Sequence, residues 1–184
     1  MDAAALACFD EEISYFSACR SSPGHYRLLV NELERLLRYE PSGKKTHAAA
    51  ALHQIAEQMH KRSLIVIFSD MMDDAEHLEE LFSSLQHLRY NKHEVILFHI
   101  VEAEQEQAFE FEKRPYEFVD LETGDRLKLQ PHQVKEEYRK QMQNFQRDIA
   151  EKCHQYQIDR VVIDLSKPVE QVLYSFLIKR NKLL

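Results

Sequence analysis

The chain has 184 residues, the size of one globular domain, and we expect residues 1–184 to form a single domain. Its 24 Lys and Arg stand against 31 Asp and Glu, a formal net charge of −7 without a basic patch, so no nucleic-acid partner is expected. The three cysteines form no Cys-x-x-Cys pair, which argues against a disulfide framework and favours the cytoplasm. The apolar runs are far shorter than the roughly 20 residues that cross a bilayer, so no membrane segment is expected.

The first third of the chain predicts a hairpin and two helices. Two short extended runs within residues 3–17, separated by polar residues, are typical of an antiparallel hairpin. A Pro-Gly pair ends it, and leucines at helical spacing then predict a helix. After a Pro-Ser-Gly loop, alanines and larger apolar residues at helical spacing predict a second helix over residues 47–60, for which Thr46 is a good N-cap.

Three apolar strands and three helices follow. Leu64 to Phe68 has no polar member, which predicts an interior strand covered on both faces, and 95–101 and 161–163 are further buried strands. Helical spacing of apolar residues predicts the connecting helices. One begins near Asp73 or Asp74, a long one begins at Pro131, and the last begins at Pro168.

Between the second strand and the long helix, the sequence predicts a small surface hairpin. Two alternating runs, Tyr116 to Leu121 and Leu127 to Leu129, flank a turn that contains Gly124. No element is predicted in the acidic stretch before it, residues 102–112.

Strands that alternate with helices predict an α/β fold, a Rossmann-like three-layer sandwich with a mostly parallel sheet. We expect the hairpin at residues 3–17 to add one antiparallel strand at an edge of that sheet. Ligands of such sheets sit at the carboxyl ends of the strands. The loops after Phe68 and Val101, and the loop before helix 47–60, are therefore the places to look for a site.

The motifs of the common catalytic sites are absent from this sequence. The sequence has only three glycines and contains neither the G-x-G-x-x-G motif nor a P-loop motif. It also contains no G-x-S-x-G and no H-E-x-x-H motif. The ten histidines are scattered and are each interpreted as surface or core residues. We therefore expect a protein that is not an enzyme.

The segment from Ser69 to Asp74 is the one group of residues in the sequence that could form a metal-binding or catalytic site. Asp70, Asp73 and Asp74 lie at the end of an apolar strand and could hold a hard cation through carboxylate oxygens. The structural alternative is that Asp73 or Asp74 caps the next helix while Asp70 holds the turn. The functional alternative that follows from the first interpretation is a metal-dependent hydrolase or phosphoesterase that uses these three residues.

Several segments of the chain together resemble a known family. They are Phe9 to Ile13, Pro41 to Thr46 with Ala51-Leu52, Leu64 to Asp70, His93 to Val95 and Asp120 to Gly124. The most specific of them is the Asp-Leu-Glu-Thr-Gly hairpin followed by a long helix that bears a tyrosine. Through these segments the sequence is similar to the bacterial domain-of-unknown-function family 58, and the resemblance runs from about Ala3 to Arg180.

The resemblance implies a von Willebrand factor A-like domain. Relatives of that type bind Mg²⁺ at a metal-ion-dependent adhesion site through an Asp-x-Ser-x-Ser loop, a Thr and an Asp, to which Thr46 and Asp70 correspond here. The Asp-x-Ser-x-Ser loop and the strand before it are absent, so we expect an N-terminally incomplete domain. Two oxygen ligands fall short of the six or so that Mg²⁺ takes. No cofactor is therefore expected in this chain, and Mg²⁺ only together with the missing ligand loop.

The resemblance also implies a function, namely a protein-binding module that acts with a MoxR-type AAA+ ATPase. In the family's strand order, the missing strand lies between residues 3–9 and residues 64–68. We expect those two strands either to pair directly or to be covered by a second chain, because a long apolar edge invites pairing. Association is favoured, and a homodimer is its simplest form.

Overall fold

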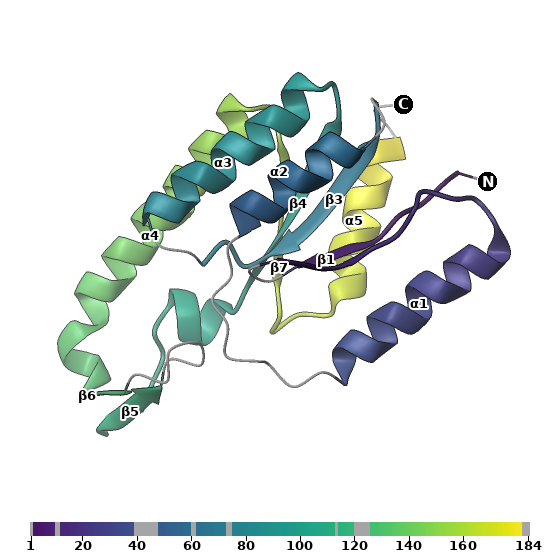
Figure 1. The fold of residues 1–184 in the computed structure, drawn as a ribbon. Helices are drawn as coiled ribbons and strands as arrows, with labels where there is room; N and C mark the ends of the chain where they lie inside the picture. Colours follow the sequence, from purple (N-terminus) through teal and green to yellow (C-terminus); the bar gives the residue numbers. More distant parts are fainter. Residues whose placement is uncertain are drawn as a thin grey trace.

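The structure is a computed structural model, and it describes residues 2–9, 12–38, 48–59, 62–72, 75–112, 114–119 and 126–181. Figure 1 shows its ribbon, in which helices surround a small twisted sheet. Thr46, Asp73 and Asp74, which the sequence singles out, lie outside the described residues.

A three-stranded parallel sheet forms the centre of the protein. It consists of β3 (Leu64–Ser69), β4 (Glu94–Val101) and β7 (Asp159–Asp164), in the order β3-β4-β7. Leu64 lies opposite Glu94, and Ile96 lies opposite Asp159. The predicted parallel arrangement of these three strands is confirmed.

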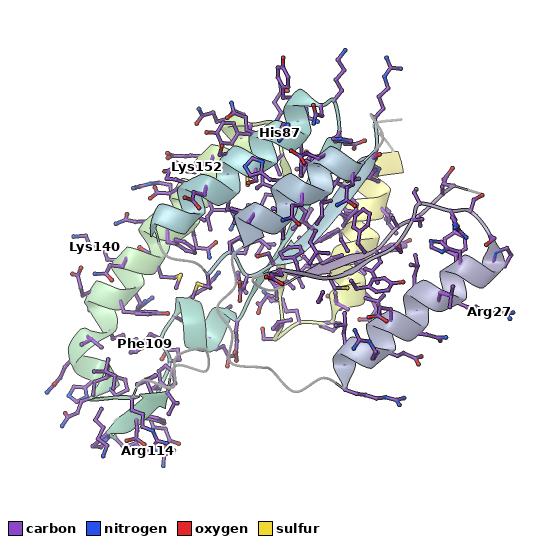
Figure 2. The ribbon with its side chains drawn as sticks, in the orientation of Figure 1. Arg27, His87, Phe109, Arg114, Lys140 and Lys152 are labelled. Carbon is purple, nitrogen blue, oxygen red and sulfur yellow. The ribbon has the colours of Figure 1, made fainter. Side chains whose placement is uncertain are left out.

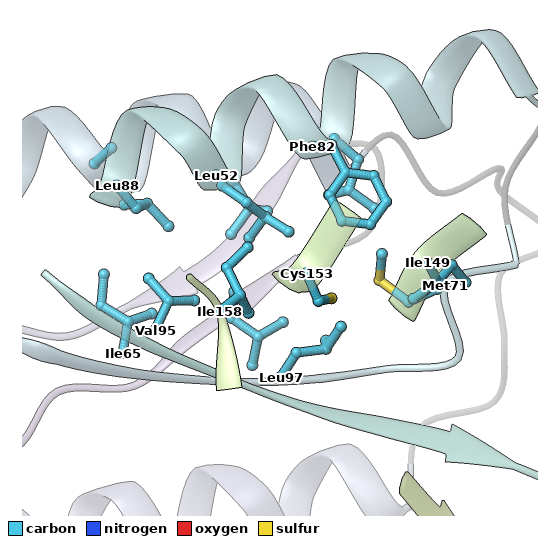
Figure 3. Close-up of a cluster of buried hydrophobic side chains, with 14 of the residues drawn as sticks. Leu52, Ile65, Met71, Phe82, Leu88, Val95, Leu97, Ile149, Cys153 and Ile158 are labelled. Carbon is cyan, nitrogen blue, oxygen red and sulfur yellow. The ribbon is translucent and has the colours of Figure 1, made fainter. Parts of the chain in front are cut away.

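Helices cover both faces of this sheet, as an α/β sandwich requires (Figure 1). On one face, α2 (Ala48–Gln58), α3 (Ala75–Tyr90) and α4 (Pro131–Gln155) enclose the larger core with Ile65, Leu97 and Ile149. Figure 3 shows side chains from these helices and from the sheet meeting in that core. On the other face, α5 (Val169–Asn181) packs on Ile96, Phe98 and Ile163. The layering is compatible with a Rossmann-like fold.

The prediction that Leu64 to Phe68 is an interior strand is wrong for the described chain. β3 is an edge strand, and its side chains alternate between exposed and buried. The cause is the position of α5, which packs against β4 and β7 on the second face and leaves the outward side chains of β3 exposed. β4 is the interior strand instead, with five consecutive buried residues from Val95 to His99.

The predicted N-terminal hairpin is present, but its predicted place at an edge of the main sheet is wrong. β1 (Ala7–Phe9) and β2 (Ile13–Phe16) pair with each other in a separate antiparallel sheet with an irregular register at Cys8 and Phe9. Ala7, Phe9, Ile13 and Phe16 pack against the larger core. The hairpin is therefore held by side-chain packing, and within the described residues neither strand is hydrogen-bonded to β3.

Helix α1 (Pro23–Leu37) follows the hairpin and lies apart from α2, α3 and α4 (Figure 1). The predicted helix is present and already includes the Pro-Gly pair that was expected to end the hairpin: proline lies in its first turn, and the Ser22 hydroxyl accepts a hydrogen bond from the His25 N–H. His25 is the one buried residue of α1, and its Nε2 lies 2.9 Å from the Ala4 carbonyl oxygen.

A small outer lobe surrounds the start of α4. As predicted, β5 (Tyr116–Val119) and β6 (Arg126–Leu129) form an antiparallel hairpin. The sequence missed a short π-helix, η1 (Ala103–Gln107), in the acidic stretch. Aromatic rings hold the lobe together: Phe109, Phe111, Tyr116, Phe118 and Tyr138. No helix among the described residues is long and apolar enough to cross a membrane.

Candidate functional site

The loop at the carboxyl end of β3 is tightly built. The Ser69 hydroxyl accepts a hydrogen bond from the Met71 N–H at 3.0 Å, and the Asp70 carboxylate accepts one from the Met72 N–H at 3.1 Å. Met71 has a φ of 59°, in the left-handed region, and its side chain is buried in the larger core. A buried methionine in this conformation costs conformational energy, which the packing around it must offset.

A buried histidine holds this loop from the neighbouring strand. The Nε2 of His99, on β4, lies 3.0 Å from the Asp70 carbonyl oxygen, and its Nδ1 lies 2.7 Å from the nearer guanidinium nitrogen of Arg160 on β7. Arg160 also donates to the Gln146 side chain on α4. β4, β7 and α4 are thereby linked to the loop that follows β3.

These contacts fix the protonation of His99. Because an arginine can only donate, Nδ1 must accept and Nε2 must donate its proton to the Asp70 carbonyl. Burial, together with the positive charge of Arg160, lowers the pKa of His99 from 6.5 to about 4. Both ring nitrogens are hydrogen-bonded, so His99 has no free lone pair for proton transfer. Its role is therefore structural: it holds the loop after β3 in place.

A second carboxylate lies at the same end of the sheet, on β7. The carboxylate of Asp164 accepts hydrogen bonds from the backbone and hydroxyl of Ser166, at 3.1 and 2.8 Å, and lies 2.9 Å from the Lys167 ammonium. Lys167 first and Ser166 second lower the pKa of Asp164 from 3.8 to about 2. Sequence reasoning missed this residue, although a polar residue at the end of an apolar run was a usable signal.

The predicted metal ligands are only partly described. Asp70 lies at the expected place, but its carboxylate is engaged in the turn with Met72. Thr46 lies outside the described residues, as do Asp73 and Asp74, so the expected proximity of Thr46 and Asp70 stays a prediction. In the part of the chain that the structure describes, no group of three or more His, Cys, Asp and Glu side chains is placed to hold a metal ion.

The outer edge of β3 is open. The Glu94 N–H donates to the Ser63 carbonyl, which means that the odd-numbered residues of β3 direct their backbone groups toward β4. Leu64, Val66 and Phe68 direct theirs away from the sheet, and no other described strand pairs there. We call the backbone groups of Leu64, Val66 and Phe68 the free edge of β3.

The side chains of the same three residues form an exposed apolar surface. Leu64, Val66 and Phe68 are 48, 42 and 59% exposed, whereas Ile65 and Ile67 between them are buried. The Phe68 ring stacks on Phe98 at 5.0 Å, and Phe98 meets Phe176 of α5 edge to face at 5.3 Å. The exposed side chains therefore lie on the α5 side of the sheet and continue the apolar surface that α5 covers over β4 and β7.

Further apolar side chains are exposed on α1 and α5, the two helices that do not enclose the larger core. On α1 they are Leu28, Val30, Leu33 and Leu37, and on α5 they are Val169, Tyr174, Leu177 and Ile178. Single exposed apolar residues are normal on a protein surface, but groups of them mark interaction sites.

A cavity of about 700 Å³ lies at the opposite end of the strands, under α5. Val161, Val172 and Phe176 line its apolar side, and the Arg180–Glu94 ion pair at 2.6 Å lies at its wall. It opens near the amino ends of β4 and β7 rather than near Asp70, where the sequence predicts a ligand.

Comparison with known proteins gave one match. A family model described as "Protein of unknown function DUF58" matches residues 1–149, more than half of the chain. No curated protein and no solved structure matches the chain.

Proposed function

The chain belongs to the DUF58 family, a family of unknown function, and from this premise we propose that it is a non-enzymatic protein-binding module. The observation that carries the proposal is the free edge of β3 with the exposed side chains of Leu64, Val66 and Phe68. An unpaired edge strand with an apolar face is a template for pairing with another polypeptide.

The other edge of the sheet offers a useful contrast. The residues of β7 that direct backbone groups outward are Arg160, Val162 and Asp164, because the Leu165 N–H donates to the Val101 carbonyl. A charged residue stands at each end of that edge, and charges discourage strand pairing. The β3 edge carries no charge between Leu64 and Phe68, so it is the favoured binding edge.

The simplest occupant of the free edge is a second copy of the chain. Exposed apolar residues on α1 and α5 would add to the buried area of such a dimer. The family resemblance implies a further protein partner, a MoxR-type AAA+ ATPase, and a von Willebrand factor A-like mode of binding. Both belong to this proposal.

The test uses two variants that match closely. Val66 on β3 and Val162 on β7 are the same residue type, each 42% exposed, on opposite edges of one sheet. In a monomer, lysine at either position extends its ammonium into solvent, so both variants are expected to fold. Light scattering at micromolar concentration should give the wild type and Val162→Lys a mass well above the 21.8 kDa monomer, and Val66→Lys a monomer mass. A monomeric wild type would exclude the homodimer.

The same pair tests the proposed ATPase partner. Binding of a purified MoxR-type ATPase from the same cell should be lost in Val66→Lys and kept in Val162→Lys. Equal binding by both variants would place the interface away from β3 and contradict the proposal.

The absence of catalysis is also proposed and has its own test. Two observations support it: both ring nitrogens of His99 are hydrogen-bonded, and the Asp70 carboxylate accepts a hydrogen bond from the Met72 N–H within a turn. A panel of phosphatase and esterase substrates with Mg²⁺ should show no turnover above background. Turnover that disappears in Asp70→Asn would instead support the metal-dependent hydrolase that uses Asp70, Asp73 and Asp74.

A further inference from the structure

Two histidines meet on the surface of α2 and α3, two of the helices that enclose the larger core. The Nδ1 atom of His53, on α2, lies 3.3 Å from the Nδ1 atom of His87, on α3. Their ring centroids are 5.5 Å apart and the ring planes are inclined by 45°. The two nitrogens are thus closer together than the rings, so the imidazoles face each other through these atoms and are not stacked. Figure 2 labels His87 on α3, on the side toward α2.

The two helices hold this pair in place. One turn before the histidines, the fully buried Ser84 hydroxyl of α3 donates to the Ala49 carbonyl of α2 at 3.0 Å. Leu85 and Leu88, on either side of His87 along α3, are 1% and 0% exposed. Because the backbones on both sides are fixed by packing, the two imidazoles meet with little freedom beyond their own side-chain torsions.

The chemistry of facing imidazoles favours a metal. Two neutral rings can share one proton between these nitrogens, and when neither Nδ1 carries a proton, two lone pairs point into the same space. Two bonds of about 2.0–2.1 Å from a metal ion to imidazole nitrogens, meeting at the tetrahedral angle, place the nitrogens about 3.3–3.4 Å apart. The observed 3.3 Å falls in that range.

We propose that His53 and His87 together bind a divalent transition-metal ion such as Zn²⁺, Ni²⁺ or Cu²⁺, and that the ion clamps α2 to α3. Imidazole suits these ions, whereas Mg²⁺ takes oxygen ligands. No third metal-binding side chain of the described residues is placed to join, so water completes the coordination. His53 is exposed, which leaves room for that water. This site involves different residues from the protein-binding edge of β3 and goes beyond the proposed function.

The test measures binding of the metal salts alone to the full chain. Zn²⁺ and Ni²⁺ should bind with one ion per chain and raise the melting temperature, while Mg²⁺ at the same concentration should not. His53→Ala and His87→Ala should each weaken binding by on the order of 100-fold, because the second imidazole binds intramolecularly. His154→Ala removes an exposed histidine of α4 and should leave binding unchanged.

A spectroscopic readout separates this site from loose binding elsewhere. Electron paramagnetic resonance of bound Cu²⁺ should show coupling to two imidazole nitrogens in the wild type, and to fewer in either single variant. The proposal is overturned if Zn²⁺ stabilises His53→Ala and His87→Ala as much as the wild type, or if the wild type binds none of the three ions. Because His53 is exposed, its variant is expected to fold, and a normal melting curve without metal verifies this.

Discussion

His99 is a polar side chain in the most buried strand of the protein, and it is neutral because of what surrounds it. Its folded pKa of about 4 lies below its ordinary value of 6.5, with burial as the first cause and Arg160 as the second. As the pH falls, the unfolded chain therefore takes up a proton before the folded chain does. The contribution of His99 to stability is complete above pH 6.5 and is lost between 6.5 and 4.

This behaviour predicts an acid-sensitive fold. The free energy of unfolding should fall by up to about 3 kcal/mol through this window, measured by urea denaturation at several pH values. His93, whose pKa burial also lowers, acts in the same direction, so the informative quantity is the difference between wild type and variant. His99→Gln should be less stable at neutral pH but should depend less on pH. An unchanged pH slope in this variant would contradict the assignment.

The residues of the candidate site were only partly predictable. Asp70 follows an apolar strand, and the strand pattern is visible in the sequence. The role of His99 is not, because its partners Asp70 and Arg160 are 29 and 61 positions away and meet it only once β3, β4 and β7 align. A histidine inside an apolar run signals burial but does not reveal which groups satisfy its two nitrogens.

At the scale of elements, β4 is the strand that contributes most to the core. Leu97 is fully buried between β3 and β7 and belongs to the larger core. Leu97→Ala should lower the free energy of unfolding by about 2–5 kcal/mol, since it removes buried methyl groups and leaves a cavity. Leu127, 60% exposed on β6, is the matched control, and Leu127→Ala should cost well under 1 kcal/mol. Equal losses in the two variants would mean that the assigned core is wrong.

The elements themselves were largely predictable, because apolar periodicity records which faces are buried. The prediction that failed is the one about the surroundings of β3. The run from Leu64 to Phe68 predicts apolar surroundings on both faces, yet in the described chain only Ile65 and Ile67 are covered. The hairpin β1–β2 was found for the same reason, but pattern alone does not say whether it joins the main sheet or packs against its core.

For the whole molecule, the mismatch at β3 is the basis of the proposed function. A sequence pattern typical of a buried strand, placed at an exposed edge, is explained if another polypeptide completes the sheet. The net charge of −7 does not oppose this contact locally, since Leu64 to Phe68 carries no charged residue. Binding at this edge would turn β3 into the interior strand that its composition predicts.

The most direct test is amide hydrogen exchange along β3, recorded by nuclear magnetic resonance at low and high protein concentration. In the monomer, the amides of Ile65 and Ile67 should be protected, because they face β4, and those of Val66 and Phe68 should exchange quickly. At high concentration, or with a bound partner protein, Val66 and Phe68 should become protected while Val162 of β7 does not change. The contradicting result is fast exchange of the Val66 and Phe68 amides in the associated protein. If these amides stay unprotected under every condition in which the protein is associated, it does not bind through the free edge of β3.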